Sequence, residues 1–381
     1  MPAVWDVIIL GGGLAGLSLA VELAQPQFAH LSVLVLEQRP HYTRDRTWSY
    51  WATHPHRFSH LERKRWTQWK TSLGGRVQLQ TSPRAYCSLD ADVFYTHAVD
   101  AIAASTNVQL RMGAQVQGTQ AQPSQVQVQL SDGNVLYAGW AMDARPPAAH
   151  AGSFTAQHFE GWKIEADCDC FDADTLDLMD FQPNREGLHF FYVLPYSSRR
   201  ALVETTWVSR WAAGMDYAGQ LEHYLSRRWP GVRYQTVYRE RGILNLEPQA
   251  RKTAGRIVPL GRNAGTLRPS TGFAFLNTLA DSQRIAQWLG QTTLVEALAG
   301  PDCFKHSRLD TWMDQIFMEG LQANWQRAPH FFMAMFEEVD ALTLTDFLSG
   351  SSSIAQRARV AMSLPKLYFI QAGWRQFLKL A

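Results

Sequence analysis

Residues 4–37 have the sequence VWDVIILGGGLAGLSLAVELAQPQFAHLSVLVLE, and this stretch determines the expected fold of the chain. Residues 4–10 are almost wholly apolar, which is typical of a strand buried in a parallel sheet. Residues 11–16 follow the spacing G-x-G-x-x-G and lead into an apolar helical run. A second apolar stretch, residues 31–36, ends at Glu37. This order predicts a dinucleotide-binding βαβ unit, whereas the glycines alone would fit an ordinary turn.

Each part of this unit has a physical task. The first glycine makes the tight turn, the second lets the backbone approach a pyrophosphate, and the third lets helix and strand pack closely. The N–H groups of the first helical turn hold phosphate oxygens, and the acid accepts hydrogen bonds from ribose hydroxyls. The residues predicted to bind the cofactor here are Gly11, Gly13, Leu14, Ala15, Gly16 and Glu37.

Two later stretches favour FAD over NAD. Residues 135–145 resemble the strand and turn before the second sugar contact of flavoproteins with two dinucleotide folds, which assigns Asp143 to the cofactor. Residues 257–273, IVPLGRNAGTLRPSTGF, resemble the late FAD motif of hydroxylase-like flavoproteins, with an ordinary turn as the alternative. Arg262 replaces the Asp usual in that motif, so the ribityl contact has to come from elsewhere. The cofactor residues expected in this motif are Gly261, Gly265, Thr271 and Gly272.

The composition narrows the class of protein. With 36 Lys+Arg and 34 Asp+Glu, the 381-residue chain has a net charge of +2, so we expect no nucleic acid partner. The 14 Trp, 19 Phe and 12 Tyr exclude a disordered or collagen-like chain. Four cysteines without a zinc spacing fit a reducing cytoplasm. Residues 7–21 are apolar but lack a preceding Lys or Arg, so we expect no signal peptide or membrane span.

The expected fold class is α/β, or α+β overall, with a discontinuous FAD-binding Rossmann-like domain. The strand-like middle of the chain would form a β-rich substrate-binding domain, and the last third has the pattern of helices. The expected ranges are 1–60, 85–150 and 255–300 for the FAD-binding domain, 61–84 and 151–254 for the substrate-binding domain, and 301–381 for the helical C-terminal region.

A candidate acid lies in the middle of the chain. Residues 188–207, LHFFYVLPYSSRRALVETTW, have the pattern of two strands joined by a polar turn. Because side chains alternate along a strand, Glu204 is expected to share a face with Leu202, Thr206 and Val208. A lone carboxyl among apolar and aromatic side chains has its pKa raised by desolvation, which makes it a proton donor near neutral pH. The alternative is an ordinary solvated glutamate.

The chain resembles the bacterial flavin-dependent lycopene cyclases along nearly its whole length. RTWS is similar to a His-Thr-Trp-Ser/Cys motif of that family, which implies cofactor contacts from Arg46, Thr47 and Trp48. The segment ERGIL resembles another family motif, in which Arg241 is assigned no step. The stretches that carry the resemblance are RTWS at 46–49, FYVLP at 191–195, RALVE at 200–204, ERGIL at 240–244 and LRPSTGF at 267–273.

The resemblance implies a lycopene β-cyclase of carotenoid biosynthesis, acting on lycopene or a related linear carotenoid. Such enzymes protonate a terminal double bond, close a ring through a carbocation and lose a proton, giving γ-carotene and β-carotene. They use reduced FAD, regenerated by NAD(P)H, without net electron transfer. The family's acid, in a Glu-acid-Thr motif, maps to the catalytic candidate Glu204. Thr205 stands where relatives carry Asp or Glu, so the supporting role of a second acid is absent there.

Other functions fit parts of the pattern. The alternatives are an FAD-dependent monooxygenase acting on a lipophilic substrate and a non-catalytic protein that binds flavin or carotenoid. The cluster His54, His56 and His60 would suit a metal, but Pro55 and the lack of partner ligands favour a polar loop, so we expect no metal site.

The C-terminal tail suggests where the protein acts. Residues 354–380 mix basic and apolar side chains in a pattern that suits an amphipathic helix on an anionic membrane. A helix packed on the body of the protein is the alternative. We therefore expect a cytoplasmic protein that is peripherally associated with the inner face of the cell membrane, and its oligomeric state is left open.

Overall fold

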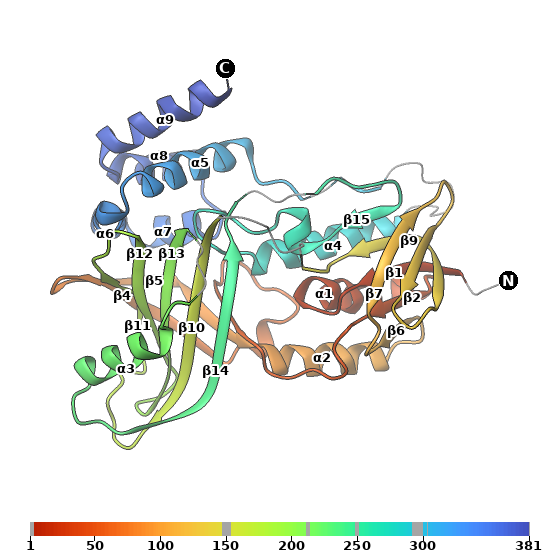
Figure 1. The fold of residues 1–381 in the computed structure, drawn as a ribbon, viewed down its shortest axis with the longest axis horizontal. Helices are drawn as coiled ribbons and strands as arrows, with labels where there is room; N and C mark the ends of the chain where they lie inside the picture. The colour runs from red at the N-terminus through yellow and green to blue at the C-terminus, as the bar shows by residue number, and fades with distance from the viewer. Residues whose placement is uncertain are drawn as a thin grey trace.

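The computed structural model describes residues 4–146, 154–210, 214–247, 251–291, 300–302 and 304–380. In this part of the chain, two β-sheets lie side by side, and a group of C-terminal helices lies over one end of the second sheet (Figure 1). The two sheets have separate tasks: the first holds the predicted nucleotide unit and the second holds the candidate acid.

The first sheet has the strand order β6-β2-β1-β9-β8-β7, with β15 paired to β9. Its centre is parallel: β1 pairs with β2 on one side and with β9 on the other. This arrangement confirms the expected Rossmann-like fold. The bounds are β1 Val4–Leu10, β2 Val33–Leu36, β6 Val108–Arg111, β7 Val116–Ala121, β8 Val126–Leu130, β9 Val135–Asp143 and β15 Ile257–Pro259.

Helices cover the first sheet and complete its core. Helix α1 packs against both α2 and α4, and all three contribute apolar side chains to one cluster with Val7 and Ile9 of β1. The bounds are α1 Leu14–Leu23, α2 Ala91–Ala103 and α4 Phe275–Gln291, with short 3-10 turns at Pro26–Phe28 and Gly261–Ala264. These helices hold the two glycine-rich segments of the predicted cofactor site in place.

The second sheet has the strand order β14-β10-β13-β12-β11-β4-β5-β3. Its pairings are antiparallel except that between β11 and β4. β3 and the end of β5, which lie in ranges expected for the FAD-binding domain, pair within this sheet. The bounds are β3 Thr47–Trp51, β4 Lys64–Leu73, β5 Arg76–Asp90, β10 Thr155–Ala166, β11 Thr175–Gln182, β12 Gly187–Pro195, β13 Arg200–Arg210 and β14 Tyr234–Asn245.

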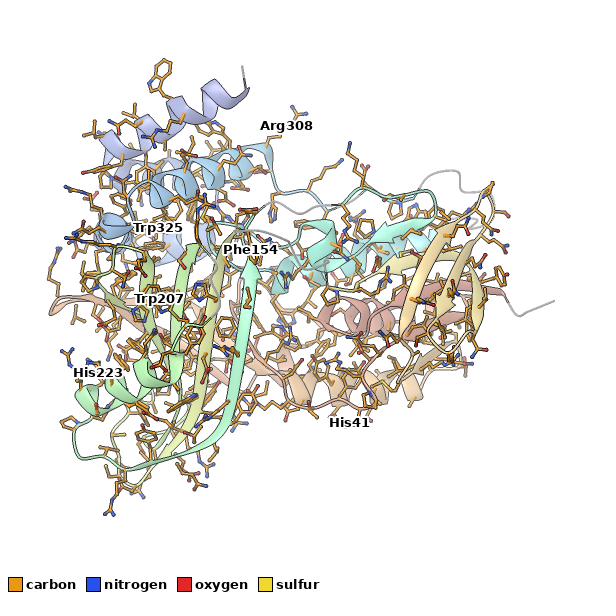
Figure 2. The ribbon with its side chains drawn as sticks, in the orientation of Figure 1. His41, Phe154, Trp207, His223, Arg308 and Trp325 are labelled. Carbon is orange, nitrogen blue, oxygen red and sulfur yellow. The ribbon has the colours of Figure 1, made fainter. Side chains whose placement is uncertain are left out.

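The two faces of the second sheet pack against different helices. Helix α3, Tyr217–Arg228, covers one face, where Trp207 donates a hydrogen bond to Gln220 and stacks on His189. Figure 2 shows Trp207 among the strands and His223 on the outer side of α3. We call this the outer face, and the opposite face, which carries Leu202 and packs toward the C-terminal helices, the inner face.

The C-terminal helices confirm the expected helical region. Their apolar side chains join the cluster of the inner face, which contains Trp66, Trp69, Phe331 and Phe336. None of the helices in the described ranges is both long and apolar enough to cross a membrane. The bounds are α5 Arg308–Gln322, α6 Ala328–Glu338, α7 Ala341–Leu348, α8 Ile354–Ser363 and α9 Lys366–Leu380, with 3-10 turns at Ser59–Leu61 and Trp325–Arg327.

Candidate active site

Two buried glutamates converge on the inner face over one glycine. Gly161 of β10 pairs with Glu204 of β13 on one side and with Glu240 of β14 on the other. Directly paired residues of neighbouring strands share a face, so both carboxyl groups lie on the same side of the sheet. A Cβ on Gly161 would lie 3.3 Å from Cγ of Glu240 and 3.5 Å from Oε2 of Glu204. The missing side chain of Gly161 therefore lets the two glutamate side chains approach each other across β10.

Glu204 is buried rather than solvated, with 8% of its surface exposed. It lies on the face that strand alternation predicts, beside the inner-face residue Leu202 and paired with Tyr192 of β12. Burial raises the pKa of Glu204 to about 8, the charge of Glu240 adds to the effect, and a hydrogen bond from the Thr206 hydroxyl opposes it. Glu204 therefore keeps its proton at neutral pH and can donate it.

Glu240 was not among the residues predicted from the sequence. It is 6% exposed, and the Thr47 hydroxyl donates a hydrogen bond of 2.9 Å to its Oε2. Burial raises the pKa of Glu240 to about 7, while the Thr47 hydrogen bond and the charge of Arg44 oppose the rise. The alternation of Tyr238, Glu240 and Gly242 places Glu240 on the inner face, and this pattern is the signal that could have identified it.

Thr205 lies on the outer face, away from Glu204. Its hydroxyl donates to Oε1 of Gln220 at 2.7 Å and lies 2.9 Å from Nε2 of His189. Adjacent residues of a strand point to opposite faces, so a carboxyl group at position 205 would point toward α3. The second acid beside Glu204 in this chain comes instead from β14.

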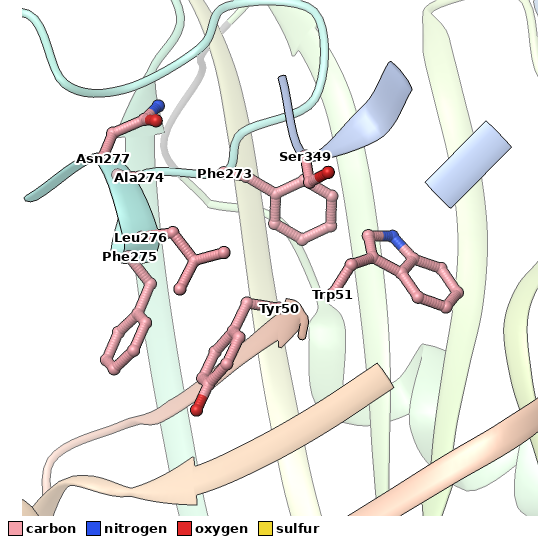
Figure 3. Close-up of a pocket in the computed structure, with 8 residues that line it drawn as sticks. All are labelled: Tyr50, Trp51, Phe273, Ala274, Phe275, Leu276, Asn277 and Ser349. Atoms are coloured by element: carbon pink, nitrogen blue, oxygen red, sulfur yellow. The ribbon is translucent and has the colours of Figure 1, made fainter. Parts of the chain in front are cut away.

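Aromatic side chains connect the two acids to a pocket. The ring of Tyr86 lies 6.2 Å from the ring of Tyr192, 6.3 Å from Phe273 and 4.6 Å from Trp51. Trp51 and Phe273 in turn line a small hollow of about 20 Å³ (Figure 3). The other residues that line it are Tyr50, Ala274, Phe275, Leu276, Asn277 and Ser349. The side chains that line this hollow are mostly apolar.

The first glycine turn fits a dinucleotide. Gly11 has a φ of +97°, and a Cβ on Gly16 would lie 1.9 Å from the carbonyl oxygen of Gly11, so both positions need glycine. A Cβ on Gly13 would meet no atom of the described residues within 4 Å, which leaves open space above the turn in this part of the structure. No side chain caps the first turn of α1, so the N–H groups around Leu14 and Ala15 can bind a phosphate.

Glu37 lies at this turn, but its carboxylate already has partners. Its two oxygens accept hydrogen bonds from the N–H of Gly12 and from the backbone N–H, Nε and Nη2 of Arg39. Burial favours a higher pKa for Glu37, but the hydrogen bonds and charge of Arg39 outweigh it and hold the pKa below its usual value. Because a carboxylate accepts about four hydrogen bonds, a ribose would have to displace part of the Arg39 contact.

The late glycine motif lies against the first turn. A Cβ on Gly261, whose φ is +62°, would lie 2.6 Å from Cβ of Ala15, and β15 pairs with the end of β9 at Asp143. Gly265, with a φ of +82°, ends the 3-10 turn that follows. Asp143 accepts two hydrogen bonds from the guanidinium group of Arg145, at 2.8 and 2.9 Å. The structure thus brings Gly261 and Asp143 close to the helix that is predicted to bind phosphate.

Arg262 is a half-buried cation in the same motif. Its guanidinium group has no hydrogen bond or ion pair with the described residues, and burial and the charge of Arg46 lower its pKa. A buried charge without a partner is costly, so a bound anion would find a favourable position here. Arg262 therefore adds a residue that could hold the cofactor, and its sequence position alone did not indicate this.

The end of the late motif reaches the second sheet. A Cβ on Gly272, whose φ is +71°, would lie 2.4 Å from Oε1 of Gln157 on β10. Gln157 and Gly161 are on one face of that strand and about 13 Å apart along it. Thr271 accepts a hydrogen bond of 3.3 Å from the N–H of Phe273. The predicted flavin segment thus lies beside the strand that carries Gly161.

The remaining predicted cofactor residues, Arg46, Thr47 and Trp48, lie at the start of β3, and the charge of Arg46 acts on Arg262 of the late motif. Arg46 is 56% exposed and pairs with Asp45, whereas the Trp48 ring packs at 5.2 Å on Phe94 and at 5.9 Å on Phe275. The role of each predicted cofactor residue stays a prediction. In the described ranges, no group of three or more His, Cys, Asp or Glu residues could hold a metal ion.

Comparison with known proteins identifies a protein family that matches this chain. The profile of the family described as "Lycopene cyclase protein" matches residues 6–372. A lycopene beta-cyclase from Paracoccus sp. (strain N81106 / MBIC 01143) is 25% identical over 396 aligned residues, which cover 95% of this chain and 94% of the relative. The match extends over both sheets and most of the C-terminal helices.

Solved structures confirm the expected fold class. A geranylgeranyl bacteriochlorophyll reductase-like protein from Thermoplasma acidophilum has a TM-score of 0.62 at 13% identity, covering 98% of this chain and 96% of that chain. The p-nitrophenol 4-monooxygenase from Pseudomonas putida DLL-E4 has a TM-score of 0.62 at 15% identity, and the match covers 97% of this chain and 99% of that chain. The flavin-dependent monooxygenase PieE, solved with FAD and substrate, has a TM-score of 0.60 at 16% identity, and the match covers 95% of this chain and 72% of that chain. At these identities the likeness concerns the fold alone.

Proposed function

Because this chain belongs to the lycopene cyclase protein family, we propose that it is a lycopene β-cyclase, which closes the linear ends of lycopene to β-rings without net redox change. One observation carries the proposal: Glu204 is a buried carboxylic acid with its pKa raised to about 8, on a sheet face lined by aromatic side chains. A protonated acid in a dry, aromatic site is what protonation of an alkene requires.

In the proposed reaction, Glu204 donates its proton to a terminal double bond of the linear carotenoid. Burial of the site excludes water, which would otherwise trap the carbocation that forms. The rings of Tyr86 and Tyr192 lie close to the acid, and an aromatic face can stabilise a desolvated cation by about 2 kcal/mol. Carbons of the chain next to the reacting end would lie along the side chains of Trp51 and Phe273.

We further propose FAD as the cofactor, with NAD(P)H as its reductant. The open space above Gly13 and the uncapped N-terminus of α1 suit the phosphates of the cofactor. The Arg262 guanidinium, which has no partner among the described residues, suits an anionic group, and Gly272 connects this region to β10. When bound in its reduced form, FAD would supply negative charge that stabilises the cation.

The C-terminal helices support a peripheral membrane contact as part of this proposal. Phe369 of α9 packs its ring at 5.2 Å from Phe331, so one side of α9 is held by the body. On α8 and α9, exposed side chains include Ile354, Met362, Leu367, Ile370 and Trp374, at 57–74% exposure, together with Lys366. Exposed apolar residues beside basic ones suit the surface of an anionic bilayer, where lycopene dissolves. We propose that the cytoplasmic protein docks through these helices.

Expression in lycopene-accumulating cells, followed by an anaerobic assay with reduced FAD, tests the proposed function. We expect cyclic isomers with the mass of lycopene, formed without oxygen. A product that contains an added oxygen atom would favour a monooxygenase. Unaltered lycopene in the presence of folded, flavin-loaded protein would favour a non-catalytic binding protein, and either result would contradict the proposal.

A further inference from the structure

We propose that Glu240 is the base of the reaction, which accepts the proton that the ring cation loses after Glu204 has donated the first. This proposal rests on the proposed cyclase function and extends it to a second catalytic residue. It is carried by the arrangement of the two carboxyl groups over Gly161 and by the different surroundings of each.

The geometry places both carboxyl groups on the same face of the sheet, on either side of Gly161. Glu204 and Glu240 flank Gly161 on the inner face, and the missing Cβ leaves no side chain between them. Phe159 folds its ring over Gly242, where a Cβ would lie 2.4 Å from the ring, so an aromatic side chain closes the space on the next inner-face position. A substrate end above Gly161 would therefore have one acid on each side.

The surroundings of Glu240 disfavour its ionised form less than those of Glu204 do. Its carboxylate accepts the Thr47 hydrogen bond, and the positive charge of Arg44 acts on it. Arg44 belongs to a group in which three cations surround one buried aspartate: Asp90 lies 2.7 Å from Arg44, 3.2 Å from Arg63 and 3.6 Å from Lys163. Positive charge thus exceeds negative charge on the side of the site where Glu240 lies.

The surroundings of Glu204 favour its neutral form. Among the described residues, the hydroxyl of Thr206 donates a hydrogen bond to its carboxyl group, and no cation pairs with it. Its paired neighbours are the phenol ring of Tyr192 and Gly161. A negative charge on Glu240 further disfavours ionisation of Glu204, because like charges across Gly161 repel. The pair therefore holds one proton, which lies on Glu204, and this separation is typical of an acid and its partner base.

The bonds and protons of the step balance without an oxidant or a reductant. The O–H bond of Glu204 breaks as a C–H bond forms at the terminal alkene. The electrons of the second double bond then form the C–C bond of the ring. A C–H bond next to the ring cation breaks, its electrons form the ring double bond, and the proton passes to an oxygen of Glu240. Return of this proton to Glu204 across the space above Gly161 restores the pair.

Several other groups near the pair can carry charge and bear on its pH dependence. Burial raises the pKa of Tyr86 and Tyr192 of the adjacent strands and of Tyr238 of β14 far above neutral, so these phenols stay uncharged. Arg44 and Asp90 form an ion pair with each other. Burial lowers the pKa of Lys163 to about 8, so Lys163 and Glu204 both titrate on the alkaline side. The acid side of a rate profile is therefore the side that reports Glu240.

The test compares the pH dependence of cyclisation by the full-length, FAD-loaded protein with that of Glu240→Gln, Glu240→Asp and Glu165→Gln. Glu165 is the control because it lies on the inner face of the neighbouring strand β10, yet its side chain is 43% exposed and pairs with Arg200 at 2.9 Å. For Glu240→Gln we expect kcat to fall at least about 100-fold, the loss typical of a general base, and the residual activity to lose its acid limb near pH 7.

The controls separate a catalytic role from a structural one. Glu240→Asp should keep the acid limb at a reduced rate, and Glu165→Gln should match the wild type. Flavin spectra recorded across the same pH range show that the cofactor is in the same state in every variant. A wild-type rate in Glu240→Gln, or a lower rate with an unchanged acid limb, would overturn the role of Glu240. If the wild type forms no ring at all, the proposed function itself fails, which is a different result.

Discussion

The Thr47 hydroxyl donates a hydrogen bond of 2.9 Å to Oε2 of Glu240, and so joins two residues that lie 193 positions apart in the chain. Thr47 begins β3, and Glu240 lies on β14, at the opposite edge of the same sheet. The bond stabilises the ionised carboxylate and ties a stretch predicted to bind the cofactor to the pair of acids. It is therefore a natural place to perturb Glu240 without changing its side chain.

Thr47→Val should raise the pKa of Glu240, because the substitution removes the donor to its charged form. A hydrogen bond to a charged group contributes about 1.5–3 kcal/mol, which corresponds to a shift of about one to two pH units. With saturating FAD, the acid limb of the rate profile should move upward by that amount. Thr47→Ser keeps a hydroxyl and should leave the limb near its wild-type position. Identical profiles for Thr47→Val and the wild type would contradict this assignment.

Gly161→Ala should separate the two acids. The new Cβ would lie 3.2 Å from Leu202 Cδ1 and 3.3 Å from Glu240 Cγ, closer than most contacts, so the side chains have to move. Overpacking of this kind costs about 1–3 kcal/mol of stability. We expect a lower midpoint in thermal unfolding and at least a tenfold loss of cyclisation.

Gly118→Ala is the matched control, since a Cβ at this position of β7 would meet no atom within 4 Å. It should leave the rate of cyclisation unchanged. Equal activity of Gly161→Ala and Gly118→Ala would show that the space above Gly161 has no part in the reaction.

Arg262→Gln should weaken FAD binding. Its guanidinium group is half buried without an ion pair in the described part of the chain, and it lies one position after Gly261, which contacts Ala15. Loss of one charge-assisted contact of about 1.5–3 kcal/mol would weaken binding about 10-fold to 100-fold, measurable by titration of flavin fluorescence. Arg111→Gln, which removes an exposed ion pair with Asp132, should bind FAD as the wild type does. Unaltered affinity in Arg262→Gln would exclude this contact.

The double substitution Leu367→Ser and Ile370→Ser should reduce membrane binding. These side chains are 66% and 57% exposed on α9, so their replacement removes apolar surface without opening the core. In sedimentation with anionic liposomes at low salt, we expect less protein in the pellet than for the wild type. Val237→Ser, which removes an apolar side chain that is 50% exposed on β14, should sediment normally. Wild-type recovery in the pellet for the α9 variant would disprove docking through this helix.

The sequence predicted those parts of the protein whose signals are local. Gly11 and Gly16 belong to one short motif, and the alternation around Glu204 is contained within one strand. Both patterns can therefore be recognised without knowledge of the tertiary structure. The same alternation shows that Thr205 faces away from Glu204, because adjacent residues of a strand cannot share a face.

Pairings between distant strands could not be predicted in this way. The partnership of Glu204 with Glu240 depends on β10 lying between β13 and β14, in a register that shifts between Lys163 and Ile164. Nothing in the local sequence specifies that register. The lack of a partner for Arg262 in the described structure is likewise a property of the packed fold, since it depends on which carboxylates lie nearby.

Glu204→Gln should also change stability in a direction that identifies a buried acid. The pKa of Glu204 rises from 4.5 to about 8 on folding, so the folded state binds the proton more tightly. The stability that this group contributes is present below pH 4.5 and is lost as pH rises toward 8. Glutamine is neutral throughout, so we expect Glu204→Gln to unfold at a higher temperature than the wild type at pH 8, with a smaller difference at pH 5.

The most direct measurement of the central claim is the product that Glu204→Gln forms from lycopene under anaerobic conditions with reduced FAD. The wild type should form cyclic isomers of unchanged mass. Glu204→Gln should leave lycopene unaltered while it binds FAD with wild-type affinity, because the amide cannot donate the proton that starts ring closure. Cyclic product from Glu204→Gln at a rate near that of the wild type would contradict Glu204 as the acid.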